Sequence, residues 1–252
     1  MPYPELIIYF FLIALIYSSV GFGGGSSYLA LLAFYALPFK EIRLIALLCN
    51  IIVVSGGTIL FIRQKSVNWR TIIPLIAISI PLSYVGARLK ISEQFFFILL
   101  GSTLLIASIF LWVDTARWKQ NAFNEKEKNN WIQNGFLGGT IGFISGMVGI
   151  GGGIFLSPLL NILKWDKPKK IAAAATIFIL ANSLAGIGGQ LSNWSGLPDI
   201  YQIGFLCLAV FLGGQIGSRI GIKWLPQLAV RRITAVLVFA AGVEVLIKHI
   251  SI

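Results

Sequence analysis

Two short glycine clusters constrain this chain more than any other feature. Residues 21–26 read GFGGGS and residues 149–154 read GIGGGI, and each cluster interrupts a long apolar tract. A glycine inside a helix costs about 1 kcal/mol relative to alanine, so the backbone is expected to leave the helix at both clusters. In lipid, such a break is tolerated only where protein groups or a water-filled cavity satisfy the freed N–H and C=O groups. Each break is therefore expected inside the protein.

Composition decides the class of protein in which these clusters lie. The 252 residues are 57% hydrophobic and only 12% charged, with a mean hydropathy of +0.85. Soluble domains carry about 25% charged residues, so the sequence predicts an integral membrane protein in contact with membrane lipid. The apolar tracts are long and lack the alternation of barrel strands, which favours an all-α bundle. The net charge of +11 comes from Lys and Arg residues in loops, as orientation signals do, and no nucleic-acid partner is expected.

The chain also matches itself. A shift of 128 residues carries the first glycine cluster onto the second, a shift of 132 carries Asn50 onto Asn182 and residues 56–57 onto 188–189, and a shift of 131 carries residues 86–89 onto 217–220. These matches in the same order predict an internal duplication. We expect a first membrane repeat at residues 1–120, a cytoplasmic linker at 121–130 and a second membrane repeat at 131–252.

The tract around each cluster fits two arrangements. As a helix, residues 26–37 extend only about 18 Å, which is well short of a hydrocarbon core of about 30 Å. Each broken tract is therefore either one interrupted span or a helical hairpin whose glycine tip reaches toward the midplane. Full spans are expected at 42–62, 71–87, 94–113, 171–191, 200–218 and 232–247.

The distribution of positive charge favours the hairpin. With hairpins, loops on one face carry 15 of the 20 Lys and Arg residues, against 12 of the 20 with interrupted spans. The positive-inside rule then places both termini outside in a multi-pass protein of the cytoplasmic (inner) membrane. A hairpin plus three spans is an odd number of crossings, so the second copy is predicted to be an inverted repeat, a plan that recurs in secondary transporters.

The glycine clusters are the first candidate binding site. A new helix begins after each cluster, and its first N–H groups lack intrahelical partners and carry partial positive charge. Glycine lets a small anion approach such groups closely, although three glycines could also serve only tight helix packing. The candidate anion-binding residues are Gly23, Gly24, Gly25, Ser26, Gly151, Gly152 and Gly153.

Three amide side chains are further candidates. Asn50 and Asn182 are expected in the middle of apolar spans, where an unpaired amide is costly. An amide offers two donors without a charge, which suits an oxyanion that must later leave, but an interhelical hydrogen bond explains both positions equally well. Gln190 follows Gly188-Gly189 and is a candidate for the polar lining of the second half.

Charged residues near the ends of spans allow two interpretations. Arg88 and Arg219 close the third span of each copy, where they either snorkel to the interface or draw anions into two entrances. Glu244 lies one helical turn before Lys248 and is a candidate for proton coupling.

Enzyme chemistry is not expected. One histidine and few acidic residues, almost all in loops, allow no metal cluster, catalytic triad or carboxylate pair within the membrane, and no cofactor is predicted. Cys49 and Cys207 occupy non-equivalent positions in the two copies, which predicts buried thiols and no disulfide framework.

The glycine motifs resemble those of a known family. Residues 21–26 and 146–153 (GMVGIGGG), the latter followed by Ser157-Pro158, are similar to the paired motifs of the TauE/SafE sulfite exporters, also called the toluene sulfonate uptake permease (TSUP) family. Length, duplication and the basic central loop match along nearly the whole chain. The first copy departs from the pattern after Ser26, with YLA at 28–30 where the second copy has LSP at 156–158. The resemblance implies movement of sulfur-containing anions, such as sulfite or organosulfonates, across the cytoplasmic membrane.

The prediction from the sequence is therefore a secondary transporter of small sulfur-containing anions, bound at the midplane between the broken helices of two inverted repeats. A passive anion channel and a membrane scaffold that transports nothing are the alternatives. Accumulation of substrate against its gradient separates a carrier from a channel. A scaffold would lose stability, but no flux, when its glycine clusters are changed.

Overall fold

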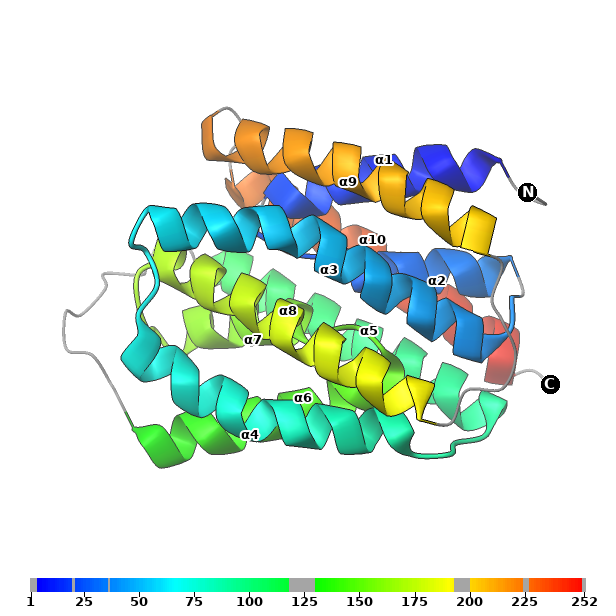
Figure 1. Ribbon diagram of the computed structural model, residues 1–252, viewed down its shortest axis with the longest axis horizontal. Coiled ribbons are helices and arrows are strands. Elements are labelled where there is room, and N and C mark those ends of the chain that lie inside the picture. Colours follow the sequence, from blue (N-terminus) through cyan, green and yellow to red (C-terminus); the bar gives the residue numbers. More distant parts are fainter. Residues whose placement is uncertain are drawn as a thin grey trace.

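The chain folds into a bundle of α-helices (Figure 1). The computed structural model describes residues 4–19, 21–35, 37–117, 130–192, 200–223 and 227–250, and within these ranges it contains ten helices and no strand. In chain order the helices are α1 (Glu5–Ser19), α2 (Gly25–Phe34), α3 (Phe39–Arg63), α4 (Trp69–Arg88), α5 (Glu93–Arg117), α6 (Trp131–Val148), α7 (Gly153–Ile162), α8 (Pro168–Leu191), α9 (Ile200–Lys223) and α10 (Gln227–Ile250). The predicted all-α fold is confirmed, whereas most of the predicted linker at 121–130 lies outside the described residues.

Both glycine clusters break the helices as predicted. The helix of the first tract stops at Ser19 and restarts at Gly25, and that of the second stops at Val148 and restarts at Gly153. Five glycines of the two breaks, at positions 21, 24, 149, 151 and 152, have φ between 78° and 87°. This left-handed region costs other L-residues about 1–2 kcal/mol each, so the glycines allow both turns to form.

Each break reverses the direction of the chain. In Figure 1, α1 runs inward from the end of the molecule that holds both termini, and α2 returns toward that end. By contrast, α6 enters from the opposite end and α7 returns there. Of the two arrangements left open by the sequence, the chain adopts the hairpin.

Five helices are long and apolar enough to cross a membrane, judged by length and composition among the described residues. They are α3, α4, most of α5, α8 and the central part of α9. The sixth predicted span, 232–247, lies in the 24-residue α10, which is not among these five helices. That helix also carries Arg231, Arg232, Glu244 and Lys248, and these charges interrupt its apolar character.

The two halves pack by the same pattern. Helix α4 packs on α6 as α9 packs on α1, and α4 meets α8 as α9 meets α3. Likewise, α5 packs on α7 as α10 packs on α2, while α3 packs on α8 and α5 packs on α10. Exchanging the halves therefore leaves the set of neighbouring helices unchanged.

The packing corrects one register of the duplication. The Cβ position of Gly57 faces Thr176, and that of Gly186 faces Leu47. A shift of 129 carries residue 57 onto 186 and residue 47 onto 176. The two contacts are therefore equivalent when α3 and α8 correspond at a shift of 129 residues. The predicted shift of 132, which paired Asn50 with Asn182 and residues 56–57 with 188–189, is wrong. The counterpart of Asn50 is Ile179, and that of Asn182 is Val53. The shift of 131 between α4 and α9 holds, because Gly86 lies on Phe143 as Gly217 lies on Leu15.

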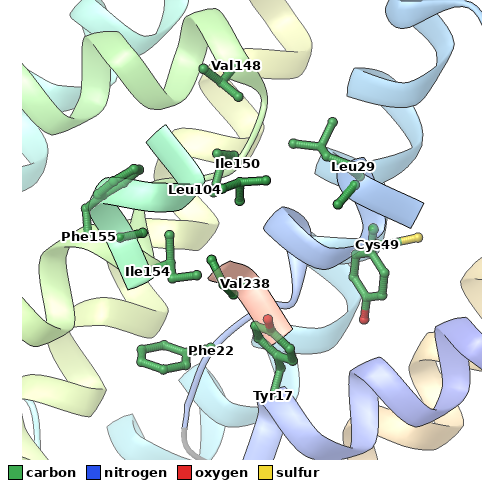
Figure 2. Packing of buried hydrophobic residues seen from close by; sticks show 14 of the residues in the cluster. Tyr17, Phe22, Leu29, Cys49, Leu104, Val148, Ile150, Ile154, Phe155 and Val238 are labelled. Carbon is green, nitrogen blue, oxygen red and sulfur yellow. The ribbon is translucent and has the colours of Figure 1, made fainter. Parts of the chain in front are cut away.

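Both breaks lie in the protein core. Phe22 and Ile150, the apolar residues of the two clusters, are buried in one hydrophobic cluster together with Tyr17 and Val148 (Figure 2). The breaks are thus covered by protein, as the cost of unpaired backbone groups in lipid requires.

Both cysteines are free thiols, as expected, but only one of them is buried. Cys49 of α3 is buried as predicted, whereas Cys207 of α9 is partly exposed.

Candidate functional site

Asn50 joins the two glycine breaks. Its side chain is fully buried in the middle of α3, and its Nδ2 donates a hydrogen bond of 2.9 Å to the carbonyl oxygen of Ile150 in the second break. A Cβ atom at Gly23 or Gly25 would collide with this amide, and one at Gly151 would lie 2.9 Å from its Nδ2. One asparagine therefore occupies the space that three glycines leave open, and both breaks depend on it.

Two polar atoms at this point are buried without a hydrogen-bond partner. They are Oδ1 of Asn50 and Oγ of Ser183, and the latter lies 2.9 Å from the Cβ position of Gly151. Buried polar atoms without a partner are uncommon and cost about 1–3 kcal/mol each. Ser183, which the sequence analysis did not single out, thus joins Asn50 and Gly151 in a small buried polar centre.

Two helix N-termini begin at the breaks. The first helical hydrogen bonds are donated by Ser27 and Tyr28 to Gly24 O in α2, and by Phe155 and Leu156 to Gly152 O in α7. The N–H groups that precede these donors belong to the first turns, which carry partial positive charge. Ser26 lies in such a turn and is buried.

The other glycines of the clusters face apolar or aromatic side chains. The Cβ position of Gly24 lies 3.0 Å from the Tyr28 ring, and that of Gly152 lies 2.8 Å from Phe178 Cε1. A Cβ at Gly153 would collide with Ile179. At these three positions glycine allows close helix packing. By contrast, Gly23, Gly25 and Gly151 surround the side chain of Asn50.

Asn182 lies in a different setting. Its Nδ2 donates to Phe178 O at 2.9 Å, and its Oδ1 accepts from Ser79 Oγ of α4. Its own carbonyl oxygen accepts from Ser83 Oγ at 3.2 Å. Both amide atoms are thus bonded, Nδ2 within α8 and Oδ1 to α4, and the two bonds from α4 fit an interhelical packing role.

A cavity of about 320 Å³ leads from one end of the molecule to the first break. We call it the Lys169 cavity; it extends from Gln64 and Lys169, at the end opposite the termini, to Gly21 and Phe22. Arg231 and Ser218 also line it. Arg219, the residue after Ser218, is exposed on α9.

A second cavity, of about 210 Å³, lies at the end that holds the termini. We call it the Gln190 cavity; its polar lining consists of Lys40, Arg43, Arg88, Lys90 and Gln190. Gln190, a candidate for the polar lining of the second half, lies in this cavity at the C-terminal end of α8. Arg88 lies in this lining as the predicted role at an entrance requires.

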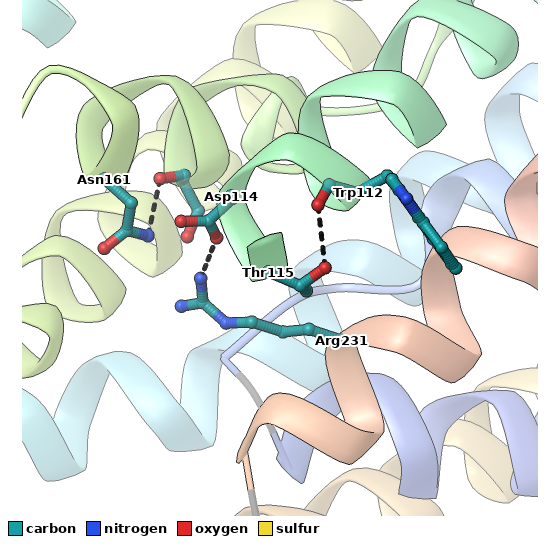
Figure 3. A network of polar contacts seen from close by, with 6 residues as sticks. Trp112, Asp114, Thr115, Asn161 and Arg231 are labelled. Atoms are coloured by element: carbon teal, nitrogen blue, oxygen red, sulfur yellow. Dashed lines mark hydrogen bonds and ion pairs between the residues drawn. The ribbon is translucent and has the colours of Figure 1, made fainter. Parts of the chain in front are cut away.

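Sequence reasoning missed three buried charged groups, Arg43, Asp114 and Arg231. Arg43, near the start of the predicted span 42–62, is only 4% exposed in the first turns of α3, and Asp114, directly after the predicted span 94–113, is 1% exposed in α5. Asp114 accepts a hydrogen bond from Arg231 Nη1 (Figure 3). Helical periodicity could have revealed Asp114, since it continues the buried positions 100, 104, 107 and 111 of α5.

Glu244, the candidate for proton coupling, is exposed on α10. Lys248, expected to pair with it, donates to Phe34 O at 3.0 Å. This contact joins the C-terminal part of α10 to α2.

Comparison with known proteins agrees with this architecture. Residues of this chain are 31% identical over 241 positions to a probable membrane transporter protein of Sinorhizobium fredii, covering 96% of this chain and 97% of the relative. A probable membrane transporter protein of Methanocaldococcus jannaschii is 28% identical, over 95% of this chain and 92% of the relative. No solved structure matches the chain. The fold and these relatives define a multi-pass membrane transporter.

The family follows from a longer match. The model of the family described as "Sulfite exporter TauE/SafE" matches residues 6–245, nearly the whole chain. The protein therefore belongs to the TauE/SafE family, as the glycine motifs indicated.

Proposed function

We propose that the protein is a secondary transporter of small sulfur-containing anions, such as sulfite or organosulfonates, and that the anion binds where the two glycine breaks meet. The observation that carries this proposal is the position of Asn50, which contacts Gly23, Gly25 and the second break at once. The same place holds two helix N-termini and the unpaired hydroxyl of Ser183. Uncharged donors and helix N-termini bind an oxyanion without the desolvation cost of a buried ion pair.

The Lys169 cavity is the proposed access route from one end. Lys169 gives its outer part positive charge, whereas the charge of Arg231 is balanced by Asp114, and Gly21 and Phe22 form the inner limit of the cavity at the first break. Exposed Arg219 and Arg88, one near each cavity, are placed to raise the local concentration of anions.

We further infer that the halves are inverted repeats in the membrane. The hairpins enter from opposite ends in Figure 1, and the packing pattern is unchanged when the halves are exchanged. Together with the positive-inside rule, this arrangement supports both termini outside the cytoplasmic membrane.

The proposal is tested by binding to purified protein. A ligand at 100 times its dissociation constant stabilises the protein by about 2.7 kcal/mol, so a thermal-shift screen with sulfite, sulfate, thiosulfate and taurine should identify the anion. Ser183→Ala removes one hydroxyl from the site and should weaken binding about tenfold without loss of folding. Gly151→Ala adds a methyl group 2.9 Å from both Asn50 Nδ2 and Ser183 Oγ and should abolish binding.

Ser192→Ala is the matched control, because Ser192 bonds Gly189 O at the end of the same helix and should leave binding unchanged. Wild-type affinity in folded Ser183→Ala and Gly151→Ala protein would contradict the proposed site. In proteoliposomes, an imposed proton gradient should drive accumulation of the anion above its external concentration. Equilibration without accumulation would identify a channel.

A further inference from the structure

We propose that the Gln190 cavity is a separate binding site for an oxyanion, in which Gln190 and Arg43 bind the ligand directly. The cavity lies at the end of the molecule that holds both termini, away from the Lys169 cavity. An anion could bind here without being transported. Its volume of about 210 Å³ holds one small oxyanion with several waters, since a water in the liquid takes up about 30 Å³.

Gln190 is the strongest indication of a missing ligand. Its side chain is 6% exposed and lines the cavity, yet neither Nε2 nor Oε1 has a hydrogen-bond partner. Leaving a whole buried amide unpaired is costly, and its NH₂ group can donate two hydrogen bonds to an anion.

Arg43 supplies the charge. Its Nη2 donates to Ala87 O at 3.3 Å and to Gly146 O at 3.0 Å, while its Nε has no partner. Its bonded partners are thus neutral carbonyl groups, and the Phe96 ring lies 5.9 Å from its Cζ. A buried guanidinium is stabilised most by an anion, and its planar fork fits an oxyanion with two donors.

The other charged side chains that line the cavity are positive, as Arg43 is. Lys40, Arg88 and Lys90 surround the cavity, and none of the described residues that line it is acidic. An anion entering from this end therefore meets four basic side chains and, among the lining residues that the structure describes, no competing carboxylate.

The Lys169 cavity occupies the equivalent place in the other half of the chain, and it lacks counterparts of Arg43 and Gln190. At the shift of 129 residues, Lys40 corresponds to Lys169, but Arg43 corresponds to Ala172 and Gln190 to Phe61. The fold therefore builds a cavity at both ends, and only the cavity at the terminal end combines a buried arginine with a buried amide.

The ligand has two potential sources, a dissolved oxyanion and the phosphate of an anionic lipid headgroup. In one arm, purified full-length protein in lipid-free detergent is titrated with sodium sulfate, against sodium chloride at equal ionic strength. In the other arm, micelles containing phosphatidylglycerol are compared with micelles containing phosphatidylcholine. Thermal unfolding is measured in both.

Gln190→Leu is the main variant. Because the wild-type amide is unpaired without ligand, this variant should unfold at the wild-type temperature or above it when no ligand is present. Its apparent affinity for the stabilising anion should fall about ten- to a hundredfold. Gln190→Glu keeps the size of the side chain and adds repulsion, so its affinity should fall at least as far. Gln133→Leu, the same change at an exposed position of α6, should respond as wild type does.

Each outcome is decisive. Loss of sulfate stabilisation in both Gln190 variants supports a site for dissolved oxyanions, and loss of only the phosphatidylglycerol effect supports a headgroup site. Full stabilisation of either folded variant in both arms, or no stabilisation of wild type in either arm, overturns the proposal. Ser183→Ala should retain the effect of the Gln190 cavity, which separates failure of this site from failure of the site at the glycine breaks.

Discussion

Asn50 and Asn182 are both buried in the middle of a helix, but they make different contacts. In Asn182 both amide atoms are hydrogen-bonded: Nδ2 donates to Phe178 O, and Oδ1 accepts from Ser79 Oγ. In Asn50 only Nδ2 is bonded, to Ile150 O, and Oδ1 has no partner. Each amide nitrogen makes one of these bonds and keeps a second N–H, so the difference lies in position: only Asn50 contacts Gly23, Gly25 and the second break at once. The structure thus separates two positions that the sequence treated as equivalent.

Replacing Asn182 by Leu should lower the yield of monodisperse protein, because Ser79 Oγ then loses its acceptor in a buried interface. Adding Ser79→Ala should recover part of the loss, since removing both partners is less costly than removing one. We expect a coupling energy of about 0.6–1.7 kcal/mol between the two side chains, measured by unfolding all four proteins. A normal yield of Asn182→Leu together with lost anion binding would instead assign this residue to the site.

Glycine-lined helix faces bring the elements together. Gly138, Gly142 and Gly146 of α6 lie, turn by turn, on the backbone at Leu75, Ser79 and Ser83 of α4. Gly213 and Gly217 of α9 lie in the same way on Phe11 and Leu15 of α1. Such four-residue spacing of small residues lets membrane helices approach closely. These faces fix α1 and α6, and with them the two glycine breaks.

Gly142→Val should therefore destabilise the bundle strongly. Its Cβ would lie 2.7 Å from both the carbonyl oxygen and Oγ of Ser79, and backbone atoms have little freedom to move. Gly204→Val in α9 is the matched control, because no atom lies within 4 Å of that Cβ position. Thermal unfolding in detergent should show a large loss for Gly142→Val and almost none for Gly204→Val. Equal effects would show that helix propensity, and not packing, governs both positions.

The Asp114–Arg231 pair connects α5 to α10 and can be tested in the same way. Asp114→Asn should cost about 3–5 kcal/mol, because it leaves the Arg231 charge buried without its carboxylate, whereas Asp114→Leu with Arg231→Met should be close to neutral. Lys170→Gln breaks the partly exposed pair with Asp166 and should cost at most about 1 kcal/mol. These losses are measured by chemical unfolding. A double variant as unstable as Asp114→Asn would refute the explanation by unpaired charge.

At the scale of the whole molecule, the two ends are chemically different. Both ends carry a basic cavity between equivalent helices, but the larger one reaches a glycine break and the smaller one ends at Arg43 and Gln190. A transporter needs such a difference in access between its two ends if it is to expose a central site to one side at a time.

The orientation of these ends in the membrane predicts a labelling pattern. Single cysteines at Arg63 and Ser92, in a background with Cys49 and Cys207 replaced, lie at opposite ends of the bundle and are exposed. An impermeant thiol reagent added to intact cells should label Ser92→Cys, and Arg63→Cys only after permeabilisation, because the Arg63 end carries most of the basic loops. The reverse pattern would invert the proposed orientation, and labelling of both from one side would contradict the fold.

The sequence by itself determined the class, the breaks and the family. Three adjacent glycines must interrupt a helix, and long apolar tracts must lie in a membrane. The motifs at 21–26 and 146–153 resemble those of TauE/SafE proteins, and the model of that family matches residues 6–245. These conclusions depend on the intrinsic cost of each residue in its own segment, which the sequence contains in full.

Only the tertiary structure decided which side chains meet. Identical residues suggested a shift of 132 between α3 and α8, but the helices pack at a shift of 129, so Asn50 faces the glycine breaks and Asn182 faces α4. The burial of Arg43 and Asp114 could not be predicted from hydropathy, because a hydropathy window covers only the helix to which each residue belongs. Their burial comes from neighbouring helices distant in sequence, since contacts across the bundle, and not the local pattern, determine what each side chain touches.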